Sequence, residues 1–77
     1  MSSWKPEVIT DDTGGRWFGN NLRFATEAET EEYLKDLPRR WSAVRDTRAV
    51  EVNEPVTHIW SVLLGRAVDL ADPSRVY

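Results

Sequence analysis

A helix-start signal at residues 26–29 divides this chain of 77 residues into two β-rich parts. Thr26 and Glu29 have the spacing of a capping box, in which the threonine accepts a hydrogen bond from the N–H three residues on and the glutamate reaches back. Apolar side chains then recur at spacings of three and four residues, at Tyr33, Leu34, Leu37, Trp41 and Val44. This pattern predicts one amphipathic helix over residues 27–44.

Pro38 lies inside the predicted helix. A proline in a helix interior removes one backbone hydrogen bond and costs roughly 3 kcal/mol. Because the apolar spacing keeps its phase past Pro38, we expect a kink or a brief break there. A complete break would make residues 39–44 a second short helix with proline in its first turn.

The segments on either side of the helix have the residue types of β-strands. We expect a first strand over residues 4–10, with Pro6 on a sheet edge where its missing N–H does no harm. Two aspartates and two glycines within residues 11–15 predict a hairpin loop that leads into a second strand over residues 16–24. A third strand, with Val50 and Val52 pointing inward, is expected over residues 48–53, and a fourth over residues 56–60.

Alternation along the second strand separates two sets of side chains. One set is expected to share an apolar interior with the helix: Phe18, Leu22 and Phe24. The other set is expected on the opposite face: Trp17, Asn21 and Arg23. Gly19, within this strand, predicts a bulge or the close approach of a neighbouring backbone.

The segment after Trp60 fits two structures. Its apolar residues match a helical stripe, but Gly65 and Arg66 can also turn a hairpin between residues 61–64 and 67–70. We favour the hairpin, because a glycine at its centre would weaken a helix. The predicted fold is therefore α+β, in the order β-β-α-β-β with a fifth strand from the hairpin: a small antiparallel sheet with one helix packed on one face.

The length of the chain predicts one domain over residues 1–77, with an ordered core over about residues 4–72 and frayed ends at 1–3 and 73–77. There is no cysteine to reinforce so small a core with a disulfide. The four tryptophans are the main source of large apolar surface. We expect Trp41 and Trp60 in the core, and Trp4 and Trp17 either in the core or on a contact surface.

Charge and composition exclude several classes of function. A net charge of −3 argues against a general nucleic-acid binder and against adhesion to an anionic membrane. No apolar run reaches the length of a membrane span and the N-terminus has no signal segment, so we expect a cytoplasmic protein.

The residues needed for common catalytic and metal sites are also missing. With no cysteine and one histidine, His58, which we expect to be half-buried or at the surface, the chain offers neither a nucleophilic triad nor a transition-metal site. Asp11 and Asp12 lack the distal glutamate of a calcium loop, and Gly14 and Gly15 precede a strand where a phosphate loop requires a helix. We therefore expect no enzyme activity, no metal and no cofactor.

Two candidate binding surfaces remain. Trp17, Asn21 and Arg23 on the uncovered sheet face, or an edge strand, are expected to bind a protein partner or a second copy of the chain. An ordinary solvated face with one large aromatic is the alternative reading. This surface gives the leading hypothesis, a non-enzymatic binding or accessory protein.

The second surface is an arginine cluster around Trp41: Arg39, Arg40, Arg45 and Arg48. Basic groups interleaved with an aromatic ring can hold phosphates or stack a base, which makes nucleic-acid or nucleotide binding the alternative hypothesis. A helix that is acidic at its start and basic at its end is, however, also what complements a helix dipole, and we favour that structural role.

Several motifs in combination resemble a known family. They are WKPEV at residues 4–8, WFGNNLRFAT at 17–26, Glu29, Tyr33, RWSAVRDTR at 40–48 and EPV at 54–56. They are similar to a family of short uncharacterised bacterial and phage proteins that reads G-N-x-L-R-F-A-T, an acidic helix start, then R-W-x-A-V-x-D-x-R-V. The family has no established activity, so the resemblance implies a fold and no function. Pro38 departs from its regular helix, and the resemblance is not followed beyond Ile59.

Overall fold

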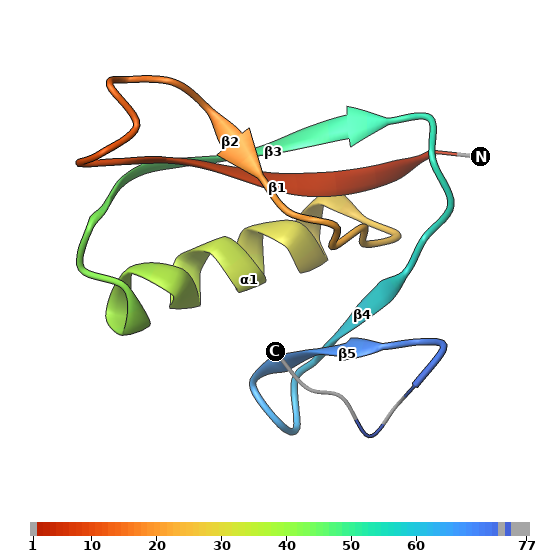
Figure 1. Ribbon diagram of the computed structural model, residues 1–77. Coiled ribbons are helices and arrows are strands. Elements are labelled where there is room, and N and C mark those ends of the chain that lie inside the picture. Colours follow the sequence, from red (N-terminus) through yellow and green to blue (C-terminus); the bar gives the residue numbers. More distant parts are fainter. Residues whose placement is uncertain (1, 73, 75–77) are drawn as a thin grey trace.

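In the computed structural model, which describes residues 2–72 and 74, one helix lies under an antiparallel sheet and a separate hairpin lies beside it (Figure 1). The elements are β1 (Ser3–Thr10), β2 (Phe18–Gly19), α1 (Glu27–Arg40), β3 (Val44–Val52), β4 (His58–Ser61) and β5 (Arg66–Asp69). The predicted α+β class and the order of the elements are confirmed. A hairpin is also present, as favoured over a helix, but it pairs residues 58–61 with 66–69, and residues 62–64, expected as strand, form its turn.

The strands are divided between two sheets, where a single sheet was expected. One sheet has the order β2-β1-β3, and β4 pairs with β5 alone. The hairpin is tied to the rest of the chain near Arg23, whose carbonyl accepts hydrogen bonds from the backbone N–H groups of Thr57 (2.9 Å) and His58 (3.0 Å). Backbone hydrogen bonds therefore connect the start of the hairpin to the segment that leads into α1.

Pro6 lies in the middle strand of its sheet, so the predicted edge position is wrong. It pairs with Ala49 of β3 on one side, and its carbonyl faces Gly19 of β2 on the other. A Cβ at Gly19 would lie 2.9 Å from that carbonyl oxygen, which confirms the close backbone approach predicted there. Pro6 has no N–H to donate on the β2 side of β1. Because β2 ends at Gly19, no carbonyl of β2 is left without a hydrogen-bond donor there.

The second strand is much shorter than residues 16–24. Only Phe18–Gly19 pairs with β1, and Phe24 then forms an isolated bridge with Trp4. Between them the side-chain oxygen of Asn20 accepts a hydrogen bond from the Leu22 N–H (3.0 Å), a local bond that competes with strand pairing.

The core joins the segment before α1 to the helix itself. Its buried apolar members are Val8, Leu22, Phe24, Tyr33, Leu34 and Ala67. The fully buried ring of Phe24 lies 5.7 Å from that of Tyr33, so the interior predicted to be shared with the helix is confirmed for Leu22 and Phe24. At the other end of α1, Phe18 and Trp41 meet edge-on at 6.1 Å but are 38% and 40% exposed. The predicted burial of Phe18 and Trp41 is therefore wrong, and Trp60 is only half-buried.

The helix begins where predicted and ends earlier. The Oγ1 of Thr26 accepts a hydrogen bond from the Glu29 N–H (3.1 Å) and donates one to the Glu29 carboxylate (3.1 Å). After Arg40, Trp41 is extended, residues 42–43 form a turn, and Val44 already belongs to β3. The helix continues through Pro38 to Arg40 without the break considered from the sequence, and residues 41–44 do not continue it.

Two smaller expectations also differ from the structure. Val50 and Val52 pair with Lys5 and Ser3, on the sheet face opposite to Val8 and α1, so they do not point into the core. Ser3, expected in a frayed end, is fully buried in β1. The expected frayed residues 1, 73 and 75–77 lie outside the described residues.

Candidate interaction site

An ion-paired network covers the sheet face that is turned away from α1. The buried carboxylate of Glu7 accepts hydrogen bonds from the Arg48 guanidinium (2.7 Å to Nε) and pairs with the Lys5 ammonium at 3.0 Å. Arg48 in turn lies over the ring of Trp17, with Cζ 4.2 Å from the ring centroid. Stacking of this kind covers one face of the indole.

The network also fixes the charge of Glu7. Burial by itself raises the pKa of this carboxyl, but the hydrogen bonds from Lys5 and Arg48 outweigh burial and lower the pKa below its ordinary value. A carboxyl with a lowered pKa stabilises the fold above its ordinary pKa, and that contribution is lost as the pH falls through the lowered value. Glu7 is thus a structural anion with no proton to offer near neutral pH.

The three residues of the predicted partner surface, Trp17, Asn21 and Arg23, make contacts with other parts of the chain. Arg23 donates to Glu54 (3.0 Å) and to the carbonyls of Asn20 and Leu22. Asn21 is exposed, and its carbonyl accepts a hydrogen bond from the Thr57 hydroxyl. Within the described residues, no hydrogen bond, ion pair or ring contact joins any two of these three side chains.

The arginines of the predicted cluster mostly have carboxylate partners within the chain. Arg40 pairs with Asp36 at 3.0 Å, Arg48 with Glu7 at 2.6 Å, and Arg45 holds Asp11 through both of its carboxylate oxygens. The hydrogen bond from Arg45 lowers the pKa of the Asp11 carboxyl below its ordinary value. Arg45 and Arg48 lie on β3, whereas Arg39 and Arg40 end α1, so the cluster is divided between two elements.

Sequence reasoning missed the most exposed apolar feature of the molecule, the turn between β4 and β5. Val62, Leu63 and Leu64, which we call the hairpin tip, are 87%, 94% and 56% exposed. Ile59 and Leu70 on the same hairpin are about half exposed. The composition of this run is that of a strand, and its place at a turn was readable only from Gly65, which follows it.

The turn that carries the hairpin tip has a defined conformation. The Gly65 N–H donates to the Ser61 carbonyl (2.7 Å), and the Leu64 N–H donates to the Ser61 hydroxyl (3.2 Å). Gly65 has a φ of 62°, which favours glycine. The hairpin tip is therefore presented by a closed turn.

The base of the hairpin is fixed against α1. Glu29, the capping-box residue, uses its second carboxylate oxygen to accept a hydrogen bond from the Trp60 N–H (3.0 Å). The Trp60 ring meets that of Tyr33 edge-on at 6.3 Å, and Ala67 of β5 is fully buried in the core. One glutamate thus links the start of the helix to the hairpin.

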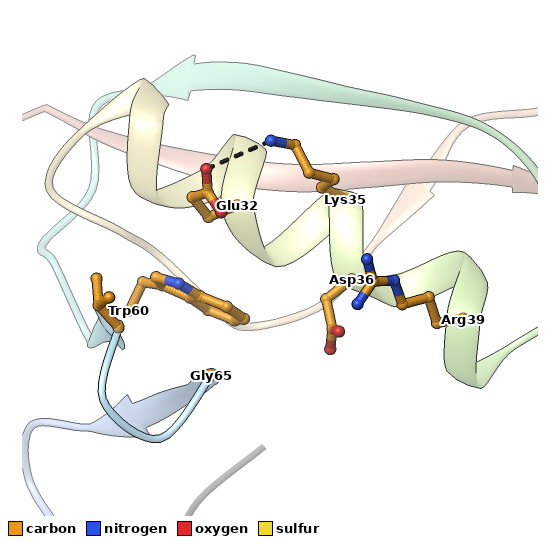
Figure 2. A pocket seen from close by; sticks show the side chains of 7 residues that line it. Glu32, Lys35, Asp36, Arg39, Trp60 and Gly65 are labelled. Atoms are coloured by element: carbon orange, nitrogen blue, oxygen red, sulfur yellow. Dashed lines mark ion pairs between the residues drawn. The ribbon is translucent and has the colours of Figure 1, made fainter.

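A groove runs between α1 and the hairpin tip (Figure 2). It encloses about 470 Å³, with Trp60, Val62 and Gly65 on the hairpin side. The helix side carries two negative and two positive residues: Glu32, Lys35, Asp36 and Arg39. An apolar ridge thus stands beside a charged helix face.

Two polar residues of the interior, His58 and Tyr33, form hydrogen bonds with neighbouring side chains. His58, expected to be half-buried or at the surface, is buried and bonds the Thr57 hydroxyl through Nδ1 (2.6 Å). Burial raises the pKa of Tyr33, whose hydroxyl accepts a hydrogen bond from Asn20 (3.2 Å). Among the described residues, no group of three or more His, Cys, Asp or Glu is placed to hold a metal ion. No helix in this part of the chain is both long and apolar enough to cross a membrane.

Comparison with known proteins adds no relative. No family model, no curated protein and no solved structure matches the chain. The family resemblance drawn from the GNxLRFAT and RWxAVxDxR motifs therefore stays a prediction from the sequence.

Proposed function

We propose that this chain is a small non-enzymatic protein-binding module that acts through the hairpin tip. The observation that carries the proposal is the exposure of three consecutive aliphatic side chains on a closed, hydrogen-bonded turn. Complete burial of one such side chain is worth about 1.5–3 kcal/mol. Covering the tip would therefore supply substantial binding free energy without any rearrangement of the fold.

The hairpin tip replaces the sheet face as the preferred surface. Trp17, the aromatic that motivated the sheet-face hypothesis, is already half-buried and lies under Arg48. The free edge of β3 is also poorly suited to accept a strand. It carries the charged residues Arg45, Asp46 and Glu51. The Asp46 carboxylate also accepts a hydrogen bond from the Thr47 N–H (2.8 Å), so this N–H already has a partner within the chain.

The nucleic-acid alternative and the cytoplasmic location stay predictions. Three of the four arginines proposed to hold phosphates are paired with carboxylates, so a phosphate would have to displace Asp36, Asp11 or Glu7. No observation on the fold favours a nucleotide over a protein partner.

A photo-reactive residue at position 63 tests the proposal. With benzoylphenylalanine in place of Leu63, irradiation in the native host is expected to give discrete adducts with protein, because this side chain would lie inside the interface. Glu51, exposed on β3 and remote from the hairpin, gives the matched control position. Adducts that are absent at position 63, or equally abundant at position 51, would contradict a binding role for the tip.

A further inference from the structure

The charges on the groove side of α1 are complementary to those on the same side of a second, antiparallel copy of α1. From the start to the end of the helix they read Glu32, Lys35, Asp36 and Arg39. If a second α1 lies across this side in the antiparallel direction, centred between residues 35 and 36, each charge meets its opposite. Glu32 then faces Arg39 of the second copy, and Lys35 faces Asp36 of the second copy. Opposite charges placed this way select both the partner and its register.

One of these four residues, Arg39, has no ion-pair partner in a single copy of the described chain. Glu32 and Lys35 pair within the chain at 3.6 Å, and Asp36 pairs with Arg40 at 3.0 Å. Arg39, although it lines the groove, makes no ion pair within the described part of the chain. An approaching Glu32 would supply one, and both of these side chains are exposed and free of the core.

The hairpin tip stands where the same symmetry would bury it. Gly65 lies across the groove from Asp36 and Arg39, beside the second half of the helix (Figure 2), and Val62 also lines this groove. A two-fold axis that runs between the two copies, perpendicular to α1 and parallel to the direction from α1 to the hairpin, makes the two helices antiparallel and places one tip against the other. Aliphatic side chains would then be buried next to the charge pairs, as in a compact isologous interface.

We propose that the hairpin tip and the charged side of α1 form the interface of a symmetric dimer of this chain. The proposal rests on the function proposed above, since it names a second copy as the protein that covers the tip. It commits to one arrangement, in which residue pairs across the interface obey the pairing 32 with 39 and 35 with 36.

Charge exchange tests that arrangement by sedimentation equilibrium. In a dimer of the Glu32→Arg variant, the introduced arginine faces Arg39 of the second copy. In a dimer of the Arg39→Glu variant, the introduced glutamate faces Glu32 of the second copy. Because the symmetry applies each change at two contacts, either variant alone is expected to raise the dimer Kd about fivefold or more. An equimolar mixture of the two variants restores both opposite-charge contacts, so it is expected to return to within about twofold of the wild-type Kd.

The controls make the same changes of charge elsewhere. Glu51→Arg on β3 and Arg16→Glu in the first loop are both at exposed positions, and we expect them to leave the Kd within about twofold of wild type. A wild-type chain that stays monomeric, or single variants that dimerise normally, would overturn the dimer. So would a mixture that fails to recover. Discrete adducts of position 63 with another protein, together with a monomeric wild type, would leave the proposed function standing and remove the dimer alone.

Discussion

Replacing Phe24 with alanine is expected to lower the free energy of unfolding by about 3–5 kcal/mol. This ring is fully buried, lies 5.7 Å from Tyr33 and 6.5 Å from His58, and therefore joins α1 to the hairpin. A single core in a chain of 77 residues supplies only about 3–5 kcal/mol in total. We thus expect Phe24→Ala to be largely unfolded without denaturant, as judged by urea titration followed by tryptophan fluorescence.

Phe18 provides the matched control for that substitution. It has the same side chain and lies earlier in the same segment, but it is 38% exposed at the edge of the sheet. We expect Phe18→Ala to cost about 1 kcal/mol, because it removes only part of a buried surface. Equal losses for the two variants would mean that the core does not centre on Phe24.

The second large effect is expected at Ala67, where β5 meets the core. Ala67 has no exposed surface, so Ala67→Asp must bury an unpaired carboxylate or release the hairpin. An uncompensated buried charge costs about 3–5 kcal/mol, and release of the hairpin avoids that cost. We therefore expect faster amide hydrogen exchange at residues 58–69, while β1 and β3 keep more of their protection.

Arg66→Asp, at the neighbouring exposed position, places the same carboxylate in solvent and serves as the control for Ala67→Asp. Its effect on hairpin exchange is expected to stay within about 0.5 kcal/mol. Similar exchange rates in the two variants would contradict the seating of the hairpin on Ala67.

Much of the fold could be predicted because the local sequence signals for the helix start and for the apolar face agree with the burial seen in the structure. The capping box at Thr26 and Glu29 marked the start of α1 correctly, and Leu22 and Phe24 were correctly assigned to the core. The end of α1 was misplaced because Trp41 and Val44 continue the apolar spacing, although the helix ends at Arg40. The predicted length of β2 was wrong for a different reason. The Asn20 side chain accepts a hydrogen bond from the Leu22 N–H, and the alternation of apolar and polar residues does not reveal such a local bond.

The candidate site could not be predicted in the same way. Val62, Leu63 and Leu64 fit a strand by composition, and only the turn closed by Ser61 and Gly65 makes them protrude. Predicting the groove also requires the hydrogen bond from the Trp60 N–H to the carboxylate of Glu29, because this bond holds the hairpin beside α1. That contact spans 31 positions in sequence and depends on the second oxygen of Glu29, to which a capping box assigns no other partner.

Methyl NMR spectra of the wild-type chain across a dilution series test the central claim most directly. If the hairpin tip is covered by a second copy, the methyl shifts of Val62, Leu63 and Leu64 will move between about 1 mM and about 10 μM, a range suited to a small interface. The methyls of Val50 and Val52, on the far face of the sheet, will stay in place. Tip methyls that hold the same shifts over the whole range, or that move no more than those of Val50 and Val52, would contradict it.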